Sequence, residues 1–128
     1  MGVMGNEDAE FIQGIITAQN AENARQRRAA AEEREAMIAE ADELARRFVE
    51  AQPSIRRILL FGSLVFPFRG RAPRDIDLWV EGAPDLAALE RIADGSPFSI
   101  DVIDGRPDGS AISIQVQKYG KVLYEAQS

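Results

Sequence analysis

A long segment without helix-breaking residues most constrains the fold of this chain. From about Asn20 to Gln52 it consists almost entirely of Ala, Glu, Arg, Leu and Met and contains no Gly or Pro. These residue types favour the α-helix, and their preferences add over a long window. One apolar stripe follows helical spacing and can lie against a core: Met37, Ala41, Leu44 and Phe48. We therefore expect a helical arm over residues 20–52, after an N-terminal segment, 1–19, with a short helix of its own.

The sequence changes character at Pro53, which disfavours helical backbone in the residue before it. Strands are predicted at 55–61, 75–80 and 98–104, with a final short strand at 121–125. A short helix is predicted at 84–94, with Asp85 as its cap. The segment 110–118 fits either a strand or a helix that Asp108 or Ser110 would cap. Strands alternating with helices predict an α/β (α+β) domain over residues 53–128, with a small mixed sheet and flanking helices.

Composition removes several classes of function. The chain has 128 residues, no Cys and no His, so thiol nucleophiles, disulfides, Cys/His zinc sites and Ser-His-Asp triads are excluded. Its net charge of -6 argues against extended nucleic-acid binding. No apolar run is long enough to span a bilayer, and the N-terminal residues do not follow the pattern of a signal peptide. We therefore expect a cytoplasmic protein that does not enter a membrane.

Acidic residues in two predicted strands are the main chemical signal. Asp75 and Asp77 are two positions apart in a strand, so both side chains project from the same face. Asp101 lies in the third predicted strand and would join them if that strand lies beside the second. Carboxylate oxygens are ligands that Mg²⁺ prefers, and three of them suit a two-metal phosphoryl or nucleotidyl transfer. The alternative is a solvated polar face, with Asp101 a simple exposed strand residue.

Gly62 and Ser63 follow the first predicted strand and have the chemistry of a phosphate-binding turn. Glycine permits a close approach of the backbone, and the amides and the hydroxyl can donate to phosphate oxygens. The alternative is a plain strand-ending turn. The surrounding segment, residues 54–74, contains five Arg and no acidic residue. Three of these arginines are candidates for triphosphate contacts: Arg69, Arg71 and Arg74.

Together these residues resemble a known family. The segment FGSLVFPFRGRAPRDIDLWV, the aspartate of SIDVID and the closing YGKVLYE are similar to minimal nucleotidyltransferases of the DNA polymerase beta-like superfamily. The resemblance covers roughly residues 54–126. It implies that Gly62 and Ser63 bind a nucleoside triphosphate, with ATP as the expected nucleotide, and that Asp75, Asp77 and Asp101 hold Mg²⁺. The implied reaction transfers a nucleotidyl group to a hydroxyl of a partner protein or a small molecule.

The resemblance also implies a partner. Small members of this family often pair with a helical HEPN-domain protein in toxin–antitoxin modules, where the minimal protein resembles an antitoxin that adenylylates a toxin tyrosine. This chain departs from the usual pattern, because Arg69-Gly70 comes late in the spacer and Arg74 stands where Ser is common. The alternative is therefore a catalytically impaired domain of the same fold that acts by contact. A scaffold based on the helical arm, including a homodimer through it, is a third reading.

Overall fold

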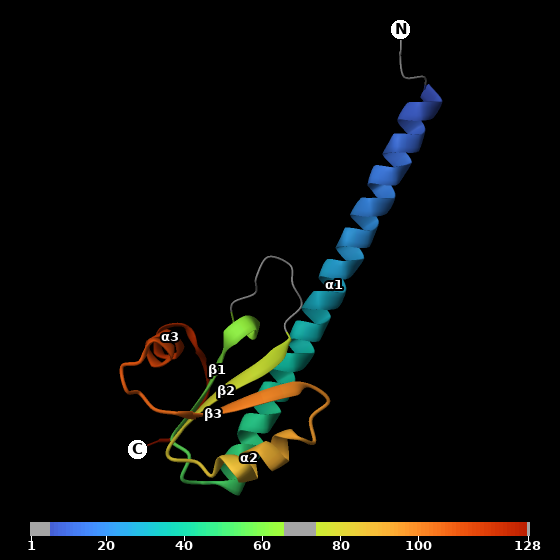
Figure 1. The fold of residues 1–128 in the computed structure, drawn as a ribbon. Helices are drawn as coiled ribbons and strands as arrows, with labels where there is room; N and C mark the ends of the chain where they lie inside the picture. Colours follow the sequence, from blue (N-terminus) through green and yellow to red (C-terminus); the bar gives the residue numbers. More distant parts are fainter. Residues whose placement is uncertain (1–5, 66–73, 128) are drawn as a thin grey trace.

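The computed structural model describes residues 6–65 and 74–127, which form a small α/β domain with one long projecting helix (Figure 1). The order of elements confirms the predicted alternation. They are α1 (Asn6–Ala51), β1 (Arg57–Phe61), the 3₁₀ turn η1 (Gly62–Leu64), β2 (Asp75–Glu81), α2 (Leu86–Ala93), β3 (Ser99–Gly105), α3 (Ala111–Tyr119) and β4 (Lys121–Glu125).

The four strands form one mixed sheet in the order β3-β2-β1-β4. β1 is antiparallel to both of its neighbours, β2 and β4. β2 and β3 are parallel, so the chain must cross over between them, and α2 makes this crossover. Asp85 caps α2 as predicted, because its side chain accepts a hydrogen bond from the backbone amide of Ala88. The predicted fold class is confirmed.

Helices cover both faces of the sheet (Figure 1). The predicted apolar stripe of α1 is fully buried and packs with α2 on one face, against alternate residues of β2: Ile76, Leu78 and Val80. On the opposite face, Val116 of α3 packs with Leu59 and Trp79. Since side chains alternate along a strand, β2 supplies the core with one set of residues and the opposite face with the other.

The long helix begins earlier than predicted. The sequence placed its start at about Asn20, whereas α1 is one continuous helix of 46 residues from Asn6 to Ala51. Nothing between the apolar cluster around Ile15 and Asn20 breaks a helix, so the two predicted helices merge. Every residue from Asp8 to Ala29 is exposed. Within the described ranges, no helix is long and apolar enough to cross a membrane.

The ambiguous segment near the C-terminus is a helix. Ser110 caps α3 by accepting a hydrogen bond from the amide of Ser113, 3.3 Å away. Asp108 supports this cap, since its side chain accepts a hydrogen bond from the amide of Ser110. Helical rather than strand geometry places Ser113 and Val116 together on the buried side of α3. The sheet face that carries the predicted aspartates therefore has a helix over part of it.

Candidate functional site

The three predicted carboxylates project from the same face of the sheet. Asp75 and Asp77 alternate with the core residues of β2, so they point away from α1. Asp101 of β3 stands directly beside Asp77 in the parallel register. Residues paired in this way point to the same side of a sheet, which brings Asp101 next to Asp77. The condition set from the sequence, that the third strand lies beside the second, is met.

Asp77 carries the electrostatic signature of a functional carboxylate. The pKa of its side chain is raised to about 6, mainly by burial and also by the nearby charges of Asp101 and Asp75. A hydrogen bond to Asp101 also favours the protonated form. Two like charges side by side are unfavourable, and a cation between them would remove the repulsion. Perturbed carboxylates of this kind are concentrated at functional sites.

The donor set fits a hard divalent cation held jointly by protein and substrate. Mg²⁺ typically takes one or two protein carboxylates and completes its coordination with water and substrate phosphates. Asp77 and Asp101 are adjacent, and Asp75 is close enough to affect the pKa of Asp77. Among the described residues, no three acidic side chains are gathered so that all could hold one ion. A complete site would therefore need further oxygen ligands, from water or from a bound ligand.

The predicted phosphate turn lies against the acidic pair. Gly62 follows β1 with φ of +79°, a conformation that favours glycine. A Cβ atom on Gly62 would lie 2.0 Å from Oδ2 of Asp77, so only glycine leaves room for this carboxylate. The register explains the approach, since Phe61 at the end of β1 pairs with Asp77. The turn and the carboxylate thus form one continuous surface.

A pocket of about 550 Å³ opens beside this turn. Its walls come from the end of β1, from η1 and from α3, which faces them across the opening. They are formed by Phe61, Gly62, Ser63, Ile112, Gln115, Val116, Tyr119 and Gly120. Its lining is largely apolar, with polar side chains at Ser63, Gln115 and Tyr119. A pocket of this size and character suits a nucleoside whose phosphates extend toward the turn.

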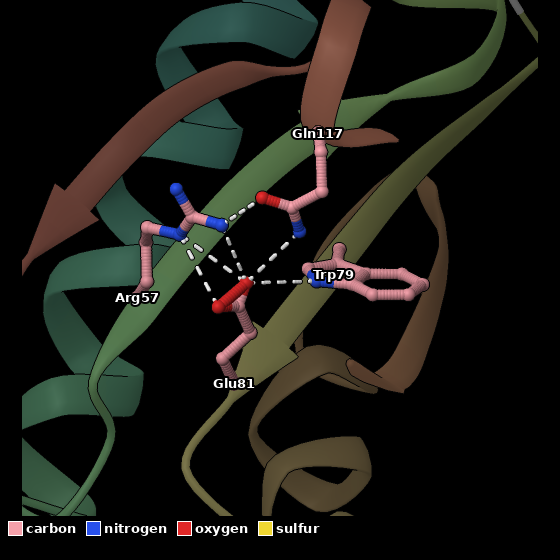
Figure 2. Close-up of polar contacts among 4 residues, drawn as sticks. All are labelled: Arg57, Trp79, Glu81 and Gln117. Carbon is pink, nitrogen blue, oxygen red and sulfur yellow. Dashed lines mark hydrogen bonds and ion pairs between the residues drawn. The ribbon is translucent and has the colours of Figure 1, made fainter. Parts of the chain in front are cut away.

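A network around Glu81 anchors α3 above the sheet (Figure 2). The Glu81 carboxylate accepts hydrogen bonds from Arg57 at 2.9 Å, Trp79 at 3.1 Å and Gln117 of α3 at 3.3 Å. Burial alone would raise the pKa of Glu81, but these hydrogen bonds and the charge of Arg57 outweigh it and hold the pKa below its ordinary value. Arg57 also donates a hydrogen bond to Gln117, so the network joins β1, β2 and α3.

The predicted arginine contacts have separate outcomes. Arg74 is exposed and directly precedes Asp75, so it is close in sequence to Asp75 and Asp77. Arg69 and Arg71 lie outside the described residues, so their role stays a prediction. Arg57, another member of the basic segment, is committed to Glu81 through an ion pair of 2.9 Å.

Three features of the site were not predicted from the sequence: Glu81, Gln117 and the α3 wall of the pocket. The signal for Glu81 was present, since it continues the alternation of Asp75, Asp77 and Trp79 along one face of β2. The wall was missed because the segment 110–118 was left open between helix and strand. Trp79 itself is 2% exposed and packs edge-on against Phe61, so it supports the face rather than offering a stacking surface.

Comparison with known proteins shows the fold. No family model matches the chain, and no curated protein matches it. A solved structure does match: a chain of the toxin–antitoxin MntA-HpeT, crystallised as a variant with two Asp-to-Glu replacements two positions apart. The TM-score is 0.50 and the identity 22%, over 67% of this chain and 74% of that chain. The domain therefore shares its fold with a chain of that toxin–antitoxin structure.

Proposed function

We propose that this protein is a Mg²⁺-dependent nucleotidyltransferase that transfers AMP from ATP to a hydroxyl group. The observation that carries the proposal is the joint position of Asp77, Asp101 and Gly62, where two adjacent carboxylates meet a glycine turn at the mouth of a pocket. The similarity to minimal nucleotidyltransferases over residues 54–126 supports the same activity.

In this proposal each part of the site has a distinct task. The pocket between η1 and α3 holds the nucleoside, and the amides and hydroxyl of Gly62-Ser63 bind the triphosphate. Asp75 and Asp77 would hold Mg²⁺, which when bound offsets the negative charge of the phosphates. The acceptor oxygen attacks the α-phosphorus, the bond to the bridging oxygen breaks, and pyrophosphate leaves with the electron pair. Asp101, which is exposed, accepts the proton of the hydroxyl.

We further propose that the acceptor belongs to a partner protein in a toxin–antitoxin module. The matching structure is a toxin–antitoxin assembly, and its variant replaces two aspartates at the spacing of Asp75 and Asp77. A helical HEPN-domain toxin with an acceptor tyrosine is the partner that the family resemblance implies. The exposed position of Asp101 leaves the site accessible to a protein side chain.

The test uses ATP labelled at the α-phosphate, Mg²⁺, and two kinds of acceptor: the protein encoded beside this chain and a panel of small hydroxyl compounds. We expect label transfer by the native protein and its loss in Asp77→Asn. Asp94→Asn is a matched control, because Asp94 is exposed at the end of α2, away from the site. Failure to label any acceptor, with ATP binding unchanged by Mg²⁺, would contradict the proposal.

A contact antitoxin is the second candidate, favoured by one observation. No three acidic residues in the described part of the chain form a ready metal site. In that case the partner would bind equally well after Asp75, Asp77 and Asp101 are all changed to Asn, and no label would be transferred. Calorimetric titration of the partner with this triple variant separates the two functions.

A further inference from the structure

The N-terminal half of α1 is a surface that neither the fold nor the proposed reaction uses. It projects away from the domain, as Figure 1 shows. Residues 8–29 are all exposed, a length of about 33 Å at 1.5 Å per residue. This exposed part of α1 is called the arm below, and it overlaps only in part with the helical arm predicted at residues 20–52. Large apolar side chains are exposed on it, including Ile12 at 42% and Ile16 at 45%. A long exposed helix with such residues is an unpartnered surface.

The arm presents an uncharged seam toward the same side as the buried stripe of α1. Its members alternate in steps of four and three: Ile12, Ile16, Gln19, Asn23 and Gln26. Steps of seven lead from Ile16 through Asn23 and Ala30 to the buried Met37. Three such steps turn a straight helix by only about 60°, so the seam and the core-facing stripe share one side. Spacing of this kind is typical of a helix that packs along another helix.

We propose that a second copy of this chain covers the seam, with the two arms antiparallel. A parallel partner is excluded by the fold, because it would continue along the same side of α1 into the space that the sheet occupies at Met37. An antiparallel partner runs away from the sheet. Full overlap of the two exposed arms places the two-fold axis near the midpoint of residues 8–29, between residues 18 and 19.

Charge complementarity points to nearly the same alignment. The start of the arm is acidic and has no basic residue before Asn20, whereas Arg25, Arg27 and Arg28 make its later part basic. An axis between residues 17 and 18 brings Asp8 level with Arg27 of the other copy, and both residues lie within about 60° of the seam. Within the seam, Ile12 then lies level with Asn23, and Ile16 with Gln19. A parallel pair would instead place like charges together.

The chain has no cysteine, so the alignment can be tested by cross-linking. We expect the full chain to sediment as a dimer, with domain centres about 75 Å apart, since fifty helical residues separate the two buried stripes. A mixture of the Ile12→Cys and Asn23→Cys variants should yield a disulfide-linked heterodimer on oxidation. Homodimers linked only at equal positions would refute the antiparallel arrangement, and a monomeric mass over the whole concentration range would refute the dimer.

Two charge variants provide the matched comparison. Ile16→Glu places a charge in the seam and should weaken the dimer by at least about tenfold. Thr17→Glu adds the same charge on the opposite side of the arm and should leave the dimer unchanged. Circular dichroism verifies that both variants keep the folded domain. If Ile16→Glu leaves the dimer intact but prevents binding of the toxin partner, the seam serves that partner and the proposal is overturned.

Discussion

Changing Asp77 to asparagine should stabilise the folded protein while removing the proposed transferase activity. The pKa of Asp77 is raised from 3.8 to about 6, mainly by burial and then by its acidic neighbours. Ionisation of Asp77 at neutral pH therefore lowers the free energy of unfolding. Asparagine has nearly the same shape and no charge, so it relieves this cost without changing the packing.

The structure sets the magnitude. A pKa change from 3.8 to about 6 corresponds to about 3 kcal/mol for a group without solvent contact. Asp77 is only half-buried, and solvent screening reduces the effect, so we expect Asp77→Asn to stabilise the fold by about 1–2 kcal/mol at pH 7.5.

The pH dependence has a defined sign. The folded protein binds the Asp77 proton more tightly than the unfolded chain, so the contribution of Asp77 to stability is highest below pH 3.8 and falls as pH rises to about 6. The gain from Asp77→Asn should therefore vanish at low pH and reach its maximum above pH 6.

Urea unfolding can be followed through the single tryptophan, Trp79, which is buried on the same face. Asp42→Asn, on the exposed part of α1, is the control and should change stability by less than about 0.5 kcal/mol. Added Mg²⁺ should stabilise the native protein and leave Asp77→Asn unchanged. A destabilised Asp77→Asn, or a gain independent of pH, would show that the acidic pair is not under electrostatic strain.

Three further changes test the surroundings of the site. Gly62→Ala combines a positive φ with a clash against the Asp77 carboxylate, so urea unfolding should show a loss of about 1–3 kcal/mol and calorimetry a loss of ATP binding. Glu81→Gln should cost about 1–3 kcal/mol at pH 7. Because the folded pKa of Glu81 is lowered, this difference should shrink as pH falls below 4.5; a constant difference would contradict the network. Ser110→Ala removes the cap of α3 and should lower the thermal midpoint by the equivalent of about 1 kcal/mol, whereas an unchanged midpoint would mean that the cap is not needed.

The residues of the site could be predicted because strand geometry has a fixed period. Alternation alone places Asp75 and Asp77 on one face of β2, and Gly62 marks the turn η1 that follows β1. The pairing of Asp77 with Asp101 needs one more step, the parallel crossover through α2. That step follows from a short capped helix between two strands, which the sequence also shows.

The walls of the site could not be predicted, for a physical reason. The segment 111–119 has apolar residues that satisfy both a strand and a helix period, and the helix agrees with the Ser110 cap and with the packing of Val116 on Leu59 and Trp79. The pocket depends on that choice, because α3 provides one of its sides. The length of α1 was underestimated for a related reason, since composition changes at Asn20 without any residue that stops a helix.

Two carboxylates on the same face of β2, Asp77 and Glu81, have opposite pKa shifts. This difference distinguishes a carboxylate that stabilises the fold from one that is available to a ligand. Glu81 meets Arg57, Trp79 and Gln117, which hold its pKa down and make it part of the framework. Asp77 meets Asp101 and a bare glycine turn, which leave its charge uncompensated within the described structure. A residue needed only for folding would resemble Glu81. An uncompensated charge at the open end of the same face is consistent with a ligand that compensates it, and the Mg²⁺ and nucleoside triphosphate of the proposed function would meet that requirement.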